Sequence, residues 1–442
     1  MADYVETELV EAEQSPHPAR RTPGAFRSLR HRDFAIYWIG LIVSTTGSWM
    51  QSAAQGWLAY DLTHNKFYLG AVTAAGSLPI LFLTLHSGVI ADRFSKRKIT
   101  IITQSFALVQ ATALAALAYF EMIQPWHLLA LAGFMGLVNA FDIPARQAMT
   151  SELVGKEDVL NAVALTSSAF NGARIAGPFI AGLIMVAFGA SVQGQTHALD
   201  RAAMMRGPGA CFFINAISYL AVIIGLLIIR PKRLPASSRD VAMRSQIQEG
   251  LAYAFKDPVI RGLLLLTAVA SIFGLQYTTL MPALAKDVLK IGPDGLGTLM
   301  AAAGLGALAA GLFVASIGHR FKPRSIVTVG SIWAPVGLIA VSFISSYPLT
   351  IACIVFIGFG MMMFLAVSNS IIQVASPDEL RGRILSVRTF VFMGLAPVGA
   401  LLIGAVAELA GVQKAILYGG IACLASALFF ALRPNGSPDS VQ

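Results

Sequence analysis

Twelve apolar stretches, each about as long as a bilayer is thick, constrain the fold of this chain more than any other feature. A helix needs about 20 mainly apolar residues to cross the hydrocarbon core of a bilayer. The stretches cover residues 34–60, 67–91, 99–120, 126–150, 160–188, 208–229, 260–285, 295–318, 325–345, 349–373, 388–408 and 413–432. Backbone polar groups inside a bilayer must be paired within the protein, so each stretch is predicted to form an α-helix. The predicted fold class is therefore an all-α polytopic membrane protein with twelve transmembrane helices.

The composition agrees with this fold class. Of the 442 residues, 56% are hydrophobic and 12% are charged, whereas soluble domains carry roughly 25% charged residues. Cys211, Cys353 and Cys423 all lie in predicted spans, where cysteine behaves as a small apolar residue. No spacing of cysteine or histidine indicates a disulfide or a metal site.

The spans divide into two pseudo-symmetric sets of six. A polar connection containing RPKRLPASSRD separates the sets, and short sequences recur in both. FMG at 134–136 matches FIG at 356–358, and ADRFSKRK at 91–98 matches GHRFKPRS at 318–325. Such repeats build transporters whose substrate site lies between the halves near the bilayer midplane. The predicted segments are an N-terminal tail over 1–33, a six-helix bundle over 34–229, an interdomain loop over 230–259, a second bundle over 260–432 and a C-terminal tail over 433–442.

The distribution of basic residues predicts the orientation. With the N-terminus in the cytoplasm, 25 of the 32 Lys and Arg residues fall on the cytoplasmic side, 6 fall outside, and Arg174 lies within a span. This asymmetry agrees with the positive-inside rule. We therefore expect a bacterial-type inner membrane protein with both termini in the cytoplasm. The positive net charge then reflects topology, and no nucleic-acid partner is implied.

The segment GVIADRFSKRK at 88–98 places five charged residues between two apolar spans. It matches a loop motif of the form G-x-x-x-D-R-x-G-R/K-R/K, with Ser95 in place of the second glycine. The matching residues are Gly88, Asp92, Arg93, Lys96 and Arg97. On this motif, the span number and the long central loop, the chain resembles the major facilitator superfamily over essentially its whole length.

The resemblance implies a role for this segment as a gate. It implies that Gly88 and Asp92, which share a helix face, address span eleven of the other half, where Asp92 can interact with a helix N-terminus. It also implies that Arg97 reaches an acid after span four, for which Glu152 is the candidate. Such a latch would join the halves on the cytoplasmic side when the transporter opens outward.

A second motif lies in the fifth span, in the sequence NGARIAGPFIAG. Gly177, Pro178 and Gly182 are similar to the superfamily's exporter motif G-P-x-x-G-G, with Ala181 in place of one glycine. Proline removes a helix hydrogen bond and small residues permit close helix approach. The alternative reading of this stretch is an ordinary kinked packing surface.

Three further segments suggest a branch of the superfamily. LRHRDFAIYWIG, DIPARQAMTSELV and QIQEGLAYAFKDPVIRGLL resemble the exporters that include the enterobactin exporter and macrolide-efflux-like proteins. This resemblance implies proton antiport. The chain contains no G-x-x-x-x-G-K-[ST] motif for binding a nucleotide, so we expect no cofactor and a proton gradient as the energy source.

Three charged residues lie inside predicted spans and more than two residues from either end, where ions cost roughly 2.5–3.5 kcal/mol on insertion scales and are suspected of function. Arg174, in span five, is expected to face an internal cavity and meet an anionic substrate group or a carboxylate; a structural ion pair is the alternative. Asp142 and Arg146 are four apart on span four and can pair. Asp142 is a candidate proton carrier, and a packing or gating role for the pair is the alternative.

Neutral amides in the spans are candidates for the lining of the cavity. They are Gln51, Gln55, Asn139, Asn171, Gln276 and Asn369. Amides inside membranes also join helices by hydrogen bonds, so only some of these residues are expected to face substrate.

The predicted function is secondary active export of small amphipathic organic molecules, siderophore-like or drug-like, by proton antiport with alternating access. An importer or a lipid-moving facilitator of the same fold is the alternative, and a non-transporting membrane receptor is a more remote one. An enzyme is not expected, because no nucleophile, base or metal-ligand cluster is present. The expected partners are a small-molecule substrate and the lipid bilayer, and the expected state is a monomer.

Overall fold

The computed structural model describes residues 24, 26–189, 201–229, 251–378 and 380–432. Within these ranges, the side chains of residues 84–86, 88–93, 156, 201–203 and 319 are not described. The N-terminal tail before residue 24, most of the interdomain loop and the C-terminal tail therefore lie outside the described residues.

Six long helices form the N-terminal group. They are α2 (Arg32–Thr63), α3 (Lys66–Arg93), α4 (Lys96–Tyr119), α5 (Pro125–Glu152), α6 (Val159–Ala187) and α7 (Arg201–Ile228). Two short 3₁₀ helices, η1 (Arg27–Arg30) and η2 (Lys156–Asp158), accompany them. Nε of Arg27 lies 2.8 Å from a carboxylate oxygen of Asp158. Residues 27–30, predicted as part of the tail, are thus docked on the α5–α6 connection.

The C-terminal group begins with an irregular seventh span. Its segments are α9 (Pro258–Val269), η3 (Ala270–Gly274), η4 (Leu275–Thr278), α10 (Met281–Ala283) and η5 (Leu284–Leu289). η3 and η5 are π-helical and η4 is a 3₁₀ helix. The sequence predicted one continuous span here. The helix is interrupted where Gly274 lowers helix propensity and Pro282 lacks a backbone donor.

The remaining spans of this group are regular except for one break. They are α11 (Pro293–Ile317), α12 (Pro323–Phe343), α13 (Tyr347–Ala375), α14 (Arg381–Gly394), α15 (Ala396–Ala410) and α16 (Val412–Leu432). α14 and α15 together form the eleventh span. The break falls at Leu395, two residues before Pro397, as expected because proline cannot continue the preceding hydrogen-bond pattern.

The two groups repeat the same packing. α3 packs on α5 as α11 packs on α13, and α4 packs on α7 as α12 packs on α16. Between the groups, α6 packs on α11 and α3 packs on α15. A rotation that exchanges the groups exchanges these two interfaces, because α3 and α11 are the second spans and α6 and α15 belong to the fifth spans. The predicted fold class, an all-α membrane protein with two pseudo-symmetric halves, is confirmed.

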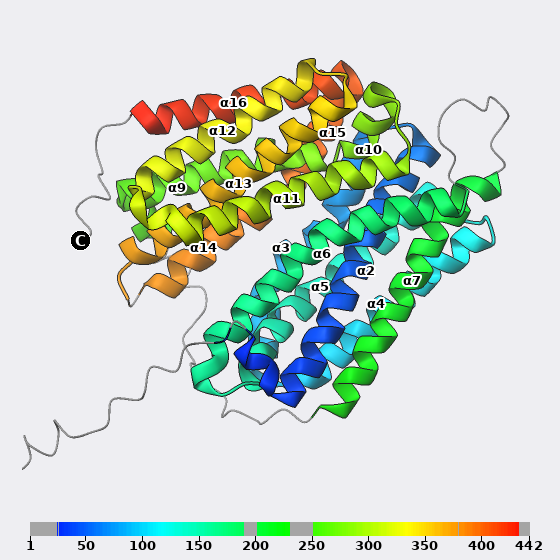
Figure 1. Ribbon diagram of the computed structural model, residues 1–442, viewed down its shortest axis with the longest axis horizontal. Coiled ribbons are helices and arrows are strands. Elements are labelled where there is room, and N and C mark those ends of the chain that lie inside the picture. The colour runs from blue at the N-terminus through cyan, green and yellow to red at the C-terminus, as the bar shows by residue number, and fades with distance from the viewer. Residues whose placement is uncertain (1–23, 25, 190–200, 230–250, 379, 433–442) are drawn as a thin grey trace, which may run out of the picture.

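Figure 1 shows the two groups lying close together at the end that holds α10 and diverging toward the end that holds α14. We call these the closed end and the open end. The α2–α3 connection lies at the closed end, where it contacts η5 and α15. The α3–α4 connection lies at the other end of α3, and hence at the open end.

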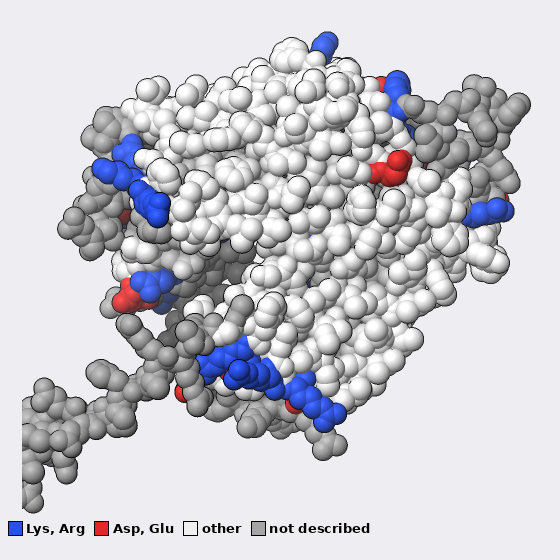
Figure 2. All heavy atoms as spheres, in the orientation of Figure 1, with Lys and Arg blue, Asp and Glu red and all other residues white. Residues whose placement is uncertain are grey.

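The surface and the helix lengths agree with a membrane protein. Figure 2 shows charged side chains gathered at the ends of the helices, with a broad uncharged band between them. Within the described residues, eleven helical segments are long and apolar enough to cross a membrane. α2 is not among them, although its 32 residues span about 48 Å at 1.5 Å per residue. The middle of α2 carries polar side chains because this part of the helix borders the cavity described below.

Candidate functional site

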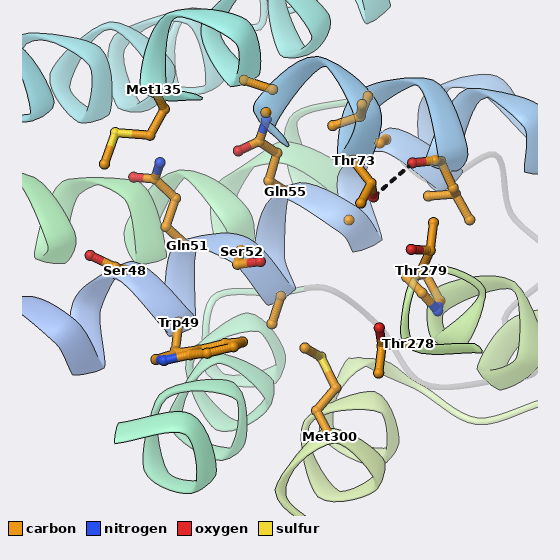
Figure 3. Close-up of a pocket in the computed structure, with 18 of the residues that line it drawn as sticks. Ser48, Trp49, Gln51, Ser52, Gln55, Thr73, Met135, Thr278, Thr279 and Met300 are labelled. Atoms are coloured by element: carbon orange, nitrogen blue, oxygen red, sulfur yellow. Dashed lines mark hydrogen bonds between the residues drawn. The ribbon is translucent and has the colours of Figure 1, made fainter. Parts of the chain in front are cut away.

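A cavity of about 400 Å³ lies between the two groups of helices. α2, α3, α5, α6 and α7 line it from the first group, and η4, α10 and α11 line it from the second. Figure 3 shows side chains from both groups around this space. Its volume falls within the range of about 300–1,000 Å³ that is usual for small-molecule sites.

The polar middle of α2 supplies much of the lining. Ser48, Ser52 and Gln55 recur at helical spacing and, with Trp49 and Gln51, border the cavity. Thr278, Thr279 and Met300 come from the second group (Figure 3). The low apolar content of α2 is therefore explained by its position beside the cavity.

Three of the six predicted amides line the cavity, namely Gln51, Gln55 and Asn139. Gln51 is also part of a helix-joining chain, because it donates to Gln110 over 3.0 Å and accepts from Asn215 over 2.8 Å. Gln55 donates to the carbonyl of Leu128 over 3.1 Å. These bonds fix α2 against α4, α5 and α7 and hold both glutamines in place.

The other three predicted amides are not part of the lining. Asn171 donates to the carbonyl of Ser167 on its own helix, over 3.0 Å. Gln276 is buried and donates to the carbonyl of Ser271 over 2.8 Å, across the irregular part of the seventh span. Asn369 lies on α13, which contributes no residue to the lining.

Arg174 borders the cavity from α6. The central carbon of its guanidinium lies 5.8 Å from the centre of the Trp49 ring, in a cation–π arrangement. Among the described residues, no carboxylate forms an ion pair with it. Arg174 thus borders the cavity, and the part of the chain that the structure describes offers it no ion-pair partner, while its role toward substrate stays a prediction.

Asp142 and Arg146 pair as their spacing predicts, with Nε of Arg146 2.6 Å from Oδ2 of Asp142. The other carboxylate oxygen accepts from Thr103 over 2.6 Å and from Gln104 over 3.1 Å. Asp142 is 1% exposed, so its charge is balanced by partners rather than by water. The cluster joins α4 to α5 and lies one helical turn from Asn139, outside the cavity lining.

The exporter-type residues of α6 lie at helix crossings. A Cβ atom added at Gly177 would lie 2.6 Å from Cβ of Trp49 on α2. One added at Gly182 would lie 2.7 Å from the carbonyl oxygen of Pro293 at the start of α11, and Pro178 lies beside Gly297 of the same helix. Gly177 therefore permits close packing of α6 on α2 of the same half, whereas Pro178 and Gly182 lie at the close contact with α11 of the other half.

Ion pairs across the halves cluster at the closed end. Lys286 of η5 pairs with Asp61 of α2. Lys66 lies 3.1 Å from Asp287, and Tyr60 donates to Asp287 over 2.5 Å. These pairs could not be predicted from the sequence, because the partners are more than 200 positions apart. The signal that existed was charge at the ends of apolar spans.

The loop motif at the open end makes different contacts from those predicted. The side chains of Gly88, Asp92 and Arg93 lie outside the description. Lys96, rather than Arg97, contacts Glu152, with Nζ 3.2 Å from the carboxylate. Arg97 instead donates to the carbonyls of Leu226 and Leu227 at the end of α7, over 2.6 and 2.8 Å. In this structure, where the motif lies at the open end, Arg97 satisfies the free carbonyls of a helix end and does not contact Glu152. The latch expected when the transporter opens outward stays a prediction.

Comparison with known proteins identifies the family. The family model described as transmembrane secretion effector matches residues 23–440. The chain belongs to this family of the major facilitator superfamily. It is therefore a membrane transporter of small molecules and not an enzyme, as predicted.

The relatives of this chain include efflux proteins and a staphyloferrin A transporter. The chain is 25% identical to the multidrug efflux pump Tap of Mycolicibacterium fortuitum, over 85% of this chain and 89% of that protein. It is 25% identical to the staphyloferrin A transporter of Staphylococcus aureus, over 88% of this chain and 93% of that protein. It is 21% identical to the macrolide efflux protein A of Streptococcus pyogenes, over 89% of this chain and 94% of that protein.

A solved structure confirms the superfamily fold. The crystal structure of a bacterial homolog of the human lysosomal transporter Spinster, inward-facing and occupied, superposes with a TM-score of 0.71. It covers 95% of this chain and 98% of that one at 13% identity. This likeness concerns the fold alone.

Several lining residues of this transporter were not singled out from its sequence. Trp49, Thr278 and Thr279 border the cavity, and a weak signal existed for each. Trp49 lies two positions before Gln51, and the two threonines lie between Gly274 and Pro282, where the helix is interrupted. Within the described part of the chain, no group of three His, Cys, Asp or Glu side chains could hold a metal ion.

Proposed function

We propose that this transporter is a secondary active exporter of small amphipathic organic molecules, driven by proton entry through alternating access. The observation that carries the proposal is the cavity between the halves, lined by both and closed at one end by contacts between them. A site of this kind meets opposite sides of the membrane when the two halves rock against each other. The efflux functions named for Tap and for the macrolide efflux protein support export.

The orientation follows from the basic residues. The α3–α4 connection at the open end carries Lys96, Arg97 and Lys98, whereas the α2–α3 connection at the closed end carries only Lys66. By the positive-inside rule the open end faces the cytoplasm. The structure then corresponds to an inward-facing state, ready to receive cytoplasmic cargo, with both termini in the cytoplasm of a bacterial cell.

Everted vesicles from cells that express the chain test this proposal. We expect fluorescent amphipathic compounds to accumulate in these vesicles only when the lumen is acidified, because efflux from the cell corresponds to uptake by everted vesicles. A protonophore should abolish the accumulation, and vesicles from cells without the protein should show none. Uptake that does not depend on the proton gradient would refute coupling of transport to protons. Flux only in the opposite direction would indicate an importer.

We also propose that the α3–α4 connection gates the cytoplasmic side. The Lys96–Glu152 pair and the two Arg97 bonds brace the ends of α4, α5 and α7. Asp92→Asn and Glu152→Gln should each slow transport by about tenfold, which is within the usual range of coupling energies between sites. Substrate affinity, measured by equilibrium binding, should stay within about twofold, because the charged connection is proposed to act on the gate, and Glu152 does not line the cavity. Normal transport by both variants would mean that the segment is only a polar connection.

A further inference from the structure

The charge of the cavity has one sign. Among the described residues that line it, Arg174 is the single side chain with a permanent charge, and no Asp, Glu or Lys is present. A cationic molecule would therefore find no formal negative charge among these residues and would be repelled by Arg174, whereas an anionic molecule would be attracted to it.

Among the described residues, no carboxylate pairs with Arg174. The buried carboxylates Asp142 and Asp61 are occupied by Arg146 and Lys286, and one described neighbour of Arg174 is the uncharged ring of Trp49. An ion without a counter-ion at membrane depth is expensive and normally faces a pathway or a partner. A guanidinium offers two parallel donors, an arrangement that fits a carboxylate.

The rest of the lining suits the remainder of an organic molecule. Gln51, Gln55, Ser52 and the hydroxyl groups of η4 offer neutral hydrogen bonds, while Trp49 and Met300 offer apolar surface (Figure 3). Methionine adapts its shape to varied apolar ligands. Arg174 is thus the described lining residue that distinguishes ligands by charge, while the neutral and apolar contacts accept molecules of varied shape.

We propose that the cargo is an organic anion, a carboxylate with an apolar or aromatic body, and that its carboxylate pairs with Arg174 while the body lies against Trp49. This inference rests on the proposed function in taking the cavity as the cargo site. It narrows the substrate class from amphipathic molecules in general to anionic ones and makes Arg174 the residue that determines charge specificity.

Three dansyl probes that differ in charge test the inference on the purified full-length protein in lipid nanodiscs. Dansylglycine is anionic, dansylamide is neutral and dansylcadaverine is cationic, and the fluorescence of each reports binding. We expect dansylglycine to bind about tenfold more tightly than dansylamide, as one charge-assisted bond would give. Dansylcadaverine should bind most weakly.

Substitutions then assign the preference to Arg174. Arg174→Gln should weaken dansylglycine binding by about tenfold and leave dansylamide unchanged, and Arg174→Lys should retain part of the preference. Arg206→Gln is the matched control, because Arg206 is exposed and does not line the cavity. Unchanged dansylglycine binding by Arg174→Gln, equal binding of the cationic probe, or no dansylglycine binding at millimolar concentration would each overturn the inference.

The outcome is separable from that of the proposed function, because binding is measured without a gradient. Anion selectivity without gradient-driven flux would keep the inference and refute proton-coupled export. Gradient-driven uptake of dansylcadaverine without a preference for dansylglycine would keep proton-coupled export and refute the inference.

Discussion

Replacing Gly182 by leucine is expected to reduce transport by about tenfold or more, the scale of a strong conformational coupling, while the protein still folds. A Cβ atom at this position would lie 2.8 Å from Cα of Asp294 and 2.7 Å from the carbonyl oxygen of Pro293, both backbone atoms of α11. Backbone atoms at a helix start cannot move aside as a side chain can. The contact that closes this end would therefore not form, and the population would shift toward states in which the halves are apart there.

Spin-label distances across the other interface measure the shift independently. Labels at Phe67→Cys on α3 and Leu409→Cys on α15 lie on exposed positions, away from the substituted helix pair. The three native cysteines are first replaced by alanine. In Gly182→Leu the distance between the labels should lengthen for most molecules, whereas in the parent protein the short distance should dominate.

Gly172→Leu is the matched control, on the same helix. A Cβ atom there meets nothing within 4 Å, so transport and the label distance should equal those of the parent. If Gly182→Leu transports normally, the α6–α11 contact is not needed for the cycle. If both variants fail equally, leucine harms α6 in general and the closed end is not implicated.

The fold was predictable because its main determinant is local. Each span is long enough and apolar enough to be recognised by itself, and the repeats around 91–98 and 318–325 disclose the duplication. The irregular seventh span was not predictable. Gly274 and Pro282 permit a distortion, but π and 3₁₀ segments form only where neighbouring helices hold them, as the close contact of Gly399 with Ile272 and Gln276 illustrates.

The site was predictable in part, and the reason differs between residues. Arg174 and Gln51 stood out because charged and amide groups are rare in spans, whereas Ser52 and Thr278 are common there and carry no such signal. The identity of the residue that contacts Glu152 depended on where α4 begins. Because the helix begins at Lys96, Lys96 and Arg97 point about 100° apart, and no sequence pattern decides which of them faces α5.

Asp142→Ala should be the most destabilising single substitution among the charged residues, by about 3 kcal/mol in the free energy of unfolding. It would leave Arg146 without its counter-ion, and it would leave the buried donors of Thr103 and Gln104 without their acceptor. The lower end of the usual range for breaking a buried pair applies, because the Arg146 side chain keeps 23% exposure. Reversible unfolding in mixed micelles measures the loss.

A double-mutant cycle with Arg146→Ala separates the ion pair from the loss of packing. The double variant should be less destabilised than the sum of the two single variants, by about 1–3 kcal/mol, because the second substitution removes the stranded charge. Asp378→Ala is the control, since Asp378 forms an exposed pair with Arg381 and such pairs contribute little. Additive effects in the cycle would show that Asp142 and Arg146 do not depend on each other for stability. Asp142 would then be free to exchange its proton without unfolding the cluster, and the proton-carrier role would gain over the structural one.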